Sequence, residues 1–292
     1  MLLWGAEGPA RPFVESFRQG LRGAGHEEGR TLVFDVRFNS SEPGRLDAVL
    51  REAVAERPAV LVVGGLAAAR RVKELTSTIP VVVATASDLV EANVVASFAR
   101  PGGNITGVSD QTDEAAVKRL ELIRAALPNA RRVALLTNPA FPATPRIEAR
   151  VGAAAARLGF TVVPLRAGDP ASLAAAVESM ATSRPDALLV GGDPLFNSGE
   201  FIGRATVLRV PVIHYWPGTV EKGALLSYEA DVLDNFHRAA GYVDKILKGA
   251  NPAEMAIHRP TRYTLTLNTE AARALGVVVP ESFRVRVDAV YP

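Results

Sequence analysis

Cysteine is absent from this chain of 292 residues. Without it the protein has no disulfide framework, no thiolate nucleophile and no cysteine-based metal site. Long apolar runs are missing too, since none approaches the roughly 20 consecutive residues that a membrane-spanning helix needs. Aromatic residues are scarce, at 6% of the chain. The few that fall near a candidate site are therefore informative.

Catalytic and cofactor motifs are also lacking. The sequence contains no HExxH or GxSxG motif, no GxxxxGK[ST] loop and no GxGxxG after the first expected strand. The four histidines do not have the spacing of a metal-binding motif. They are His26, His214, His237 and His258. A lone histidine at a strand end, such as His214, is more often structural. We therefore expect no enzyme activity, no metal and no cofactor.

The charge distribution argues against nucleic-acid binding. The isoelectric point is near 9.0, but the formal net charge is only +2. The densest cationic groups are the pairs Arg70-Arg71 and Arg131-Arg132, whereas a phosphate-binding surface needs several cations on one face. We expect no nucleic-acid partner.

An internal repeat is the most informative feature that is present. RPAVLVVGG at 57–65 resembles RPDALLVGG at 184–192, and each is followed by a helical segment and a second apolar run. Those runs are PVVVATASD from Pro80 and PVIHYW from Pro211, and LLWG from Leu2 has a weaker counterpart in LLTN from Leu135. The order and spacing of these copies predict two similar lobes.

Short apolar runs alternate with amphipathic, alanine-rich segments throughout both copies. Strands that are buried on both faces and separated by helices form parallel sheets. The expected strands are 2–5, 32–38, 60–63, 81–84, 105–108, 133–137, 161–165, 187–190 and 212–215. The expected helices are 11–24, 44–57, 67–77, 114–126, 145–158, 171–183 and 199–208. The pattern predicts an α/β protein with two Rossmann-like lobes, each built on a parallel sheet.

The C-terminal segments are too few for a third domain and should complete the two sheets. This requires the backbone to cross between lobes near 108–111, 216–223 and 258–261, and three crossings would make a hinge. We predict a first lobe of residues 1–108 plus 222–258 and a second lobe of residues 109–221 plus 259–292.

The loops after the strands are the expected ligand site, because open parallel sheets bind ligands at the carboxyl ends of their strands. Gly64-Gly65-Leu66 and Gly191-Gly192 each lie between a strand and a helix. Glycine lets backbone N–H groups approach a ligand, and a helix N-terminus favours an anion. Glu7 lies in the first such loop and Asn138 in the corresponding loop of the second lobe. The alternative for the glycines is a tight turn without a ligand.

Polar and aromatic side chains in these loops complete the candidate set. Ser87 and Asp88 follow one strand and Asp193 follows another, where they could bind an ammonium group or cap helices instead. Five aromatic residues lie near the same loops, and they are Phe141, Phe196, Tyr215, Trp216 and Tyr228. Planar rings could sandwich an apolar ligand, although Phe196 and Tyr228 also suit a core. Trp216 is the strongest candidate of the five.

Several segments resemble one known family. FRQGLRGAGHEEGRTLVFDVRFN, within 13–39, is similar to the FxxGLxxxGYxEGxNVxxxxRxA opening of ABC-transporter substrate-binding proteins of the tryptophan/tyrosine uptake type. RPGGNITG at 100–107, KRLELIRAALPNARRVALLTNP from Lys118, KILKGANPAE from Lys245 and AARALGVVVPESF from Ala271 agree with it. The resemblance spans nearly the whole chain.

The resemblance implies a type I periplasmic-binding-protein fold whose cleft closes on a small molecule. It implies capture of an amino acid or related carboxylate, such as an aromatic acid, for an ABC permease in the membrane. It also implies export to the periplasm or to a membrane anchor. Met1 leads directly into LLWGA and not into a charged start and an apolar stretch, so either the protein is cytosolic or an export signal has been removed from this sequence. Ser87-Asp88, Asn138 and Asp193 fall on the family's polar loops.

Two other functions remain open at this point. The same fold serves as the ligand-sensing effector domain of transcriptional regulators, which normally carry a DNA-binding helix pair before the first strand. An enzyme is the third possibility, but two-lobed racemases need a cysteine from each lobe and this chain has none.

Overall fold

The computed structural model describes residues 2–4, 7–39, 44–86, 89–110, 112–141, 143–260 and 262–292. Its contacts divide the chain into two compact units. The first unit comprises Met1–Gln111 and Asp231–Thr261, and the second comprises Thr112–Ala230 and Arg262–Pro292. Each unit has its own sheet and its own apolar clusters.

The first unit is built on a five-stranded parallel sheet of order β2-β1-β3-β4-β5. The strands are β1 (Leu2–Trp4), β2 (Arg37–Asn39), β3 (Leu61–Gly64), β4 (Val81–Thr85) and β5 (Ile105–Gly107). The helices are α1 (Glu7–Gly23), α2 (Arg45–Ala55), α3 (Leu66–Leu75) and α9 (Val232–Leu247), with a 3₁₀ turn η3 (Pro252–Glu254). Strand and helix alternate as the sequence pattern predicts.

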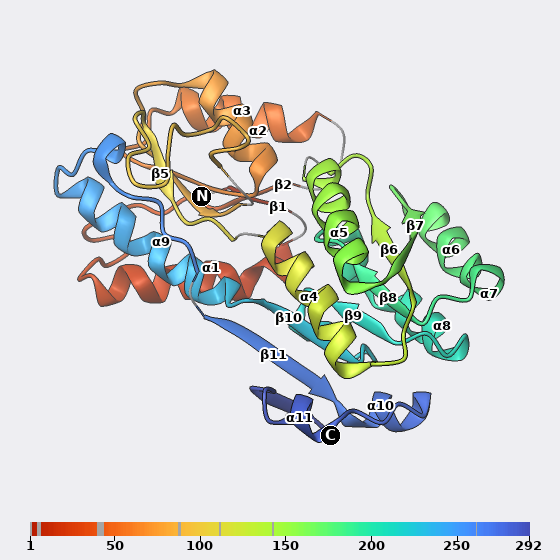
Figure 1. Cartoon of the computed structure of the whole chain (residues 1–292). Coiled ribbons are helices and arrows are strands. Elements are labelled where there is room, and N and C mark those ends of the chain that lie inside the picture. The colour runs from red at the N-terminus through yellow and green to blue at the C-terminus, as the bar shows by residue number, and fades with distance from the viewer. Residues whose placement is uncertain are drawn as a thin grey trace. The chain divides into compact units, whose positions relative to one another are not determined.

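Two apolar clusters cover the two faces of this sheet. On one face α1 and α9 lie side by side (Figure 1), and Phe17 and Phe236 pack on Val82. On the other face Leu50 of α2 and Val72 of α3 pack on Val83. Successive valines of β4 thus face opposite clusters, which explains why this strand is a continuous apolar run.

The second unit has a seven-stranded sheet of order β12-β11-β10-β9-β8-β6-β7. Its strands are β6 (Arg132–Thr137), β7 (Thr161–Arg166), β8 (Ala187–Val190), β9 (Val212–His214), β10 (Leu226–Ala230), β11 (Tyr263–Asn268) and β12 (Ala289–Tyr291). Only the β10–β11 pair is antiparallel among the strands described. The order β7-β6-β8-β9-β10 repeats β2-β1-β3-β4-β5, as the internal repeat predicts.

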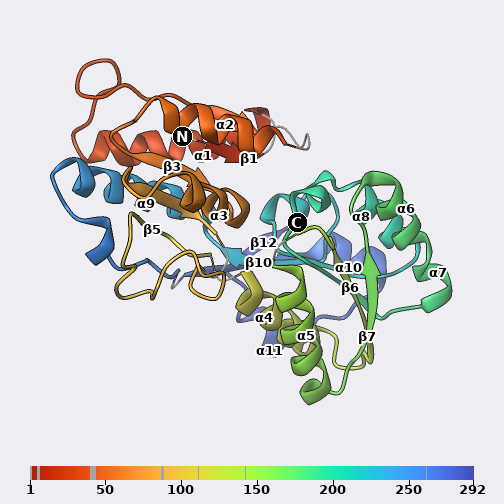
Figure 2. The same ribbon diagram turned by 90° about the horizontal axis from the view of Figure 1, so that it is seen from above.

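Helices cover both faces of the second sheet (Figure 2). One apolar cluster includes residues of α4 (Thr112–Ala126) and α5 (Thr144–Leu158), and the other includes residues of α6 (Pro170–Glu178) and α8 (Glu200–Val207). The remaining helical segments are α7 (Met180–Ser183), α10 (Thr269–Leu275), α11 (Glu281–Arg284), η1 (Pro194–Ser198) and η2 (Pro217–Thr219). The predicted α/β fold class with two parallel-sheet lobes is confirmed.

The helix after the fifth strand of each repeat belongs to the other unit. Helix α4 follows β5 but packs in the second unit, and α9 follows β10 but packs in the first. With the return before β11, the chain passes between the units at 111/112, 230/231 and 261/262. The sequence placed the outer two crossings at 108/109 and 258/259.

Residues 222–230 are a correction to the predicted lobes. The sequence assigned them to the first lobe, but β10 pairs with β9 and β11 in the second sheet. The repeat explains this outcome, because β10 is the fifth strand of the second copy and pairs beside the fourth. The chain therefore leaves the second unit after β10, not before it.

The segment 32–38 is a second correction, since β2 spans only Arg37–Asn39. Leu32, Phe34 and Val36 pack against the cluster that contains α1, and Val33 between them is 93% exposed. The rings of Phe34 and Phe17 stack with centroids 5.4 Å apart. The alternating apolar pattern thus reflects packing of an irregular segment on α1 and not strand pairing.

The RPGGNITG motif connects β5 to the segment before β4 and to the segment after η3 through side-chain hydrogen bonds. The Asn104 side-chain amide donates to the carbonyl oxygens of Thr76 and Ile79 at 3.1 and 2.8 Å. The Thr106 hydroxyl donates to Met255 O at 2.7 Å, and Gly107 adopts a φ of +134°. These contacts give the motif a structural role in the first unit.

Candidate functional site

The carboxyl ends of the parallel strands carry most of the predicted site residues. In the first unit, α1 begins at Glu7 after β1, and Gly65 and Leu66 follow β3. In the second unit, Asn138 follows β6, Asp193 follows β8 and Trp216 follows β9 by two residues. Ser87 and Asp88 lie outside the described residues, as does the Glu7 side chain.

Gly65 connects β3 to α3 in a conformation that glycine favours, with φ of +89° and ψ of 150°. A Cβ atom added there would meet nothing within 4 Å, so conformation and not space explains the glycine. Its N–H donates to Thr85 O at 2.7 Å. Leu66 is 6% exposed and belongs to an apolar cluster, so its backbone N–H is the only polar donor that it could present to a ligand.

Asp110 is a polar residue of this edge that the sequence analysis did not select. Its carboxylate accepts a hydrogen bond from the Thr85 hydroxyl at 3.0 Å, and its N–H donates to Ala86 O at 2.8 Å. Both contacts tie the end of β4 to the segment that follows β5.

Asn138 and Asp193 meet at the carboxyl edge of the second sheet. The Asn138 Nδ2 donates to Asp193 Oδ2 at 3.1 Å, and Leu195 N donates to Asp193 Oδ1 at 2.8 Å. Burial raises the pKa of the Asp193 carboxyl, and the hydrogen bonds from Leu195 and Asn138 partly offset that rise. Asp193 thus caps η1, which the capping alternative predicted, and it lies at the predicted edge of the sheet.

His214 joins the loops after β8 and β9. Its side chain has no solvent exposure; Nε2 donates to Phe196 O at 3.1 Å, and Nδ1 accepts from Trp216 N at 2.9 Å. Burial lowers its pKa to about 3, so the ring is neutral at ordinary pH. The neutral tautomer supplies one donor and one acceptor, as both contacts require. His214 is structural, in agreement with the sequence analysis.

Lowering the pH from 6.5 toward 4 should destabilise the protein through His214. In this range the histidine of the unfolded chain, with a pKa of roughly 6.5, binds a proton, whereas the buried ring of the folded protein stays neutral. The free energy of unfolding therefore falls by about 1.4 kcal/mol for each pH unit. Urea unfolding of the wild type and His214→Gln across this range measures the effect. The difference in free energy of unfolding between the wild type and His214→Gln should become smaller as the pH falls. A difference that does not change with pH would contradict the conclusion that His214 is buried in its neutral form.

Tyr215 connects three parts of the second-unit edge. Its hydroxyl lies 2.8 Å from Asp193 O and 2.6 Å from Asn197 Oδ1, and its ring stacks on His214 with centroids 4.7 Å apart. Burial raises the pKa of the Tyr215 phenol well above its ordinary value. The phenol is therefore a neutral hydrogen-bonding group that positions Asp193.

Trp216 and Phe141 are both partly buried. Trp216 precedes η2, and its carbonyl accepts a 2.5 Å hydrogen bond from the Thr219 hydroxyl. Phe141 packs on the largest apolar cluster of the second unit, and Phe196 is completely buried. Phe196 is therefore a core residue, while Trp216 and Phe141 keep some exposed surface near the candidate edge.

Tyr228 lies in the middle of β10 and stacks on Tyr263 of β11, with ring centroids 5.3 Å apart. Beside it is a buried ion pair that the sequence analysis missed: Arg119 of α4 donates from Nη1 to Glu229 Oε2 at 3.2 Å. The Arg119 guanidinium carbon also lies 5.9 Å from the Tyr215 ring centroid. No sequence signal distinguishes Arg119 from the other cations of α4.

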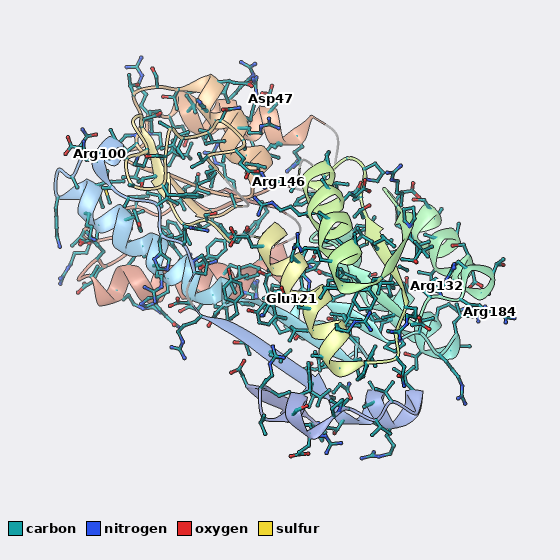
Figure 3. All side chains as sticks on the ribbon, viewed as in Figure 1. Asp47, Arg100, Glu121, Arg132, Arg146 and Arg184 are labelled. Carbon is teal, nitrogen blue, oxygen red and sulfur yellow. The ribbon has the colours of Figure 1, made fainter. Side chains whose placement is uncertain are left out.

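A groove of about 790 Å³ lies at the opposite end of the second sheet. It is lined by segments that precede β6, β8 and β9, including Asn129, Arg184 and Pro211. Arg132 and Arg184 lie close together at this end (Figure 3), where Arg132 donates to Ser183 O at 3.0 Å. Ligands of open parallel sheets bind at carboxyl ends, so this groove is not the candidate site.

Among the described residues, no helix combines the length and the apolar character that crossing a membrane requires. The same residues also contain no group of three or more acidic or histidine side chains arranged to hold a metal ion.

The known proteins that this chain is similar to include proteins that bind small molecules. The sequence profile of a family described as "ABC transporter substrate binding protein" matches residues 6–291. The "Tyrosine-binding protein" of Clostridioides difficile strain R20291 is 21% identical over 270 residues, covering 90% of this chain and 76% of that protein.

Solved structures are similar over the full length. A conserved domain protein from Vibrio cholerae has 28% identity and a TM-score of 0.91, covering 99% of this chain and 98% of its own. An ABC domain from Streptococcus pneumoniae, solved in complex with L-Trp, has 25% identity and a TM-score of 0.87, covering 99% of both chains.

Proposed function

Because this chain belongs to the family of ABC transporter substrate-binding proteins, we propose that it captures an aromatic amino acid for an ABC permease in the membrane. The family, and the type I periplasmic-binding-protein fold predicted from sequence, are confirmed by these similarities. The observation that carries the ligand proposal is the similar Streptococcus pneumoniae domain in complex with L-Trp. The related "Tyrosine-binding protein" supports the same ligand class.

The chemistry of the second-unit edge suits such a ligand. Asp193 offers a carboxyl group for an ammonium group, while the partly buried residues Trp216 and Phe141 offer aromatic rings for an aromatic side chain. In the proposal the polar loops of the first unit, with Glu7, Gly65, Ser87 and Asp88, contribute the other contacts. Ligand contacts from both units would favour closure about the three chain crossings, since only a closed state gains all of them.

The remaining parts of the proposal follow from family membership. The protein is exported, to the periplasm or to a membrane anchor, and it performs no chemistry on its ligand. Family membership also favours transport over the alternative of a regulator's effector domain.

Thermal unfolding with a panel of amino acids tests the function. L-Trp, L-Tyr or L-Phe at about 100 times its dissociation constant should stabilise the protein by roughly 2.7 kcal/mol, a rise of several degrees in Tm. Mass spectrometry of the recovered ligand should show it unchanged. L-Lys and L-Glu serve as controls. An unaltered Tm with every aromatic amino acid and aromatic acid would contradict the proposal.

Tryptophan fluorescence provides an independent measurement, because the chain has only two tryptophans. Titration with L-Phe, which does not emit in the same range, should change the emission of the wild type. The change should disappear in Trp216→Phe if that ring contacts the ligand.

A further inference from the structure

Arg119 is the largest side chain of the described residues that is fully buried, with no solvent exposure. Its guanidinium carries five N–H donors and stays charged under all ordinary conditions. Burial lowers its pKa, and the Glu229 carboxylate opposes that change. A cation in such a place needs partners for its donors as well as a counter-charge.

Within the described part of the chain, one nitrogen of this guanidinium has hydrogen-bond partners. Nη1 donates to Tyr228 O at 3.1 Å and to Glu229 Oε2 at 3.2 Å, which accounts for both of its hydrogens. Nε and Nη2 are buried, and neither has a hydrogen-bond partner among the residues that the structure describes. These two nitrogens form the side of a guanidinium that binds a carboxylate through two parallel hydrogen bonds.

Arg119 is linked to the proposed ligand edge through Tyr215. Arg119 lies beside the Tyr215 ring at the end of β9, and the Tyr215 hydroxyl contacts Asp193 O. Glu229 Oε1 also accepts a hydrogen bond from Ala230 N at 3.1 Å, and this contact fixes the position of the carboxylate that balances the charge of Arg119. The Arg119–Glu229 pair has no net charge. A zwitterionic amino acid also has no net charge, so its binding would leave the net charge of the site unchanged.

We propose that the Nε/Nη2 fork of Arg119 binds the α-carboxylate of the amino acid ligand. This inference rests on the proposed function and assigns its carboxylate contact. The fork is buried in this structure, so binding requires it to become accessible to the ligand. The site would then prefer free amino acids over the corresponding amines, because only the acid offers two acceptor oxygens to the fork.

The test compares L-Tyr with tyramine, which lacks the carboxylate, by isothermal titration calorimetry. The wild type should bind L-Tyr at least 100-fold more tightly than tyramine. Arg119→Lys keeps the charge but loses the fork, and it should bind L-Tyr at least 30-fold more weakly while its tyramine affinity changes less than threefold. Arg124→Lys, the same substitution in α4, should leave both affinities unchanged.

A second measurement needs no variant to remain folded. In wild-type protein labelled with ¹⁵N-arginine, the Arg119 Nε–H resonance should shift downfield with L-Tyr and stay in place with tyramine. If L-Tyr binds but this resonance does not respond, or if Arg119→Lys binds L-Tyr as tightly as the wild type, the carboxylate assignment is overturned and the proposed function stands. Failure of the wild type to bind any aromatic amino acid would overturn both.

Discussion

Replacing Gly107 with alanine is expected to lower the free energy of unfolding by about 4 kcal/mol or more, among the largest effects of a single substitution. Gly107 has a φ of +134°, which L side chains rarely adopt. A Cβ atom there would lie 2.1 Å from Val83 O and 2.6 Å from Val83 N. Because both atoms belong to the neighbouring strand β4, β5 must separate from β4 to accept the methyl group.

Gly103 provides a matched control within the same RPGGNITG motif. It is exposed, and an added Cβ atom would meet nothing within 4 Å. Urea unfolding followed by circular dichroism should therefore place Gly103→Ala within about 0.5 kcal/mol of the wild type. If Gly107→Ala lowered the free energy of unfolding as little as Gly103→Ala, this would contradict the close approach of β5 to β4 at Gly107.

The second large effect is expected from Glu229→Leu, which removes the counter-charge of Arg119. Glu229 is 7% exposed and Arg119 is fully buried, so the remaining cation could not be solvated. Removing one partner of a buried ion pair costs roughly 3–5 kcal/mol, mainly because an uncompensated charge stays behind. Chemical denaturation of the purified variant measures this loss.

The double variant Arg119→Met/Glu229→Leu separates lost charge compensation from lost packing. Replacing both charges with apolar groups of similar size is often close to neutral, so the double variant should recover most of the stability lost by Glu229→Leu. A double variant that is less stable than Glu229→Leu would show that the pair does not act through charge compensation.

The strand-helix alternation and the repeat were predictable because they depend on local signals. Pro80 and Pro211 precede the corresponding strands β4 and β9, and Gly159 ends α5 with a φ of +69°. The alternation of apolar residues in 32–38 was misread because a segment packed on a helix and a half-buried strand give the same pattern.

The candidate site was predictable only in part. The rule that ligands bind at strand carboxyl ends selected Asn138, Asp193 and Trp216, and the structure brings Asn138 and Asp193 into contact. Tyr228 and Leu66 were selected by the same rule, yet both side chains pack on apolar clusters. Asp110 was not selected, because its partner Thr85 is 25 residues away in the chain and no local pattern links the two residues.

By itself, the sequence determined the fold class, the duplication and the family, because burial periodicity, glycine and proline positions and motifs are properties of neighbouring residues. Only the tertiary structure decided that β10 belongs to the second sheet, that His214 is held neutral between two loops and that Arg119 pairs with Glu229. Arg119 and Glu229 are 110 residues apart in the chain. Their contact depends on how α4 packs against β10, and no local pattern records that packing.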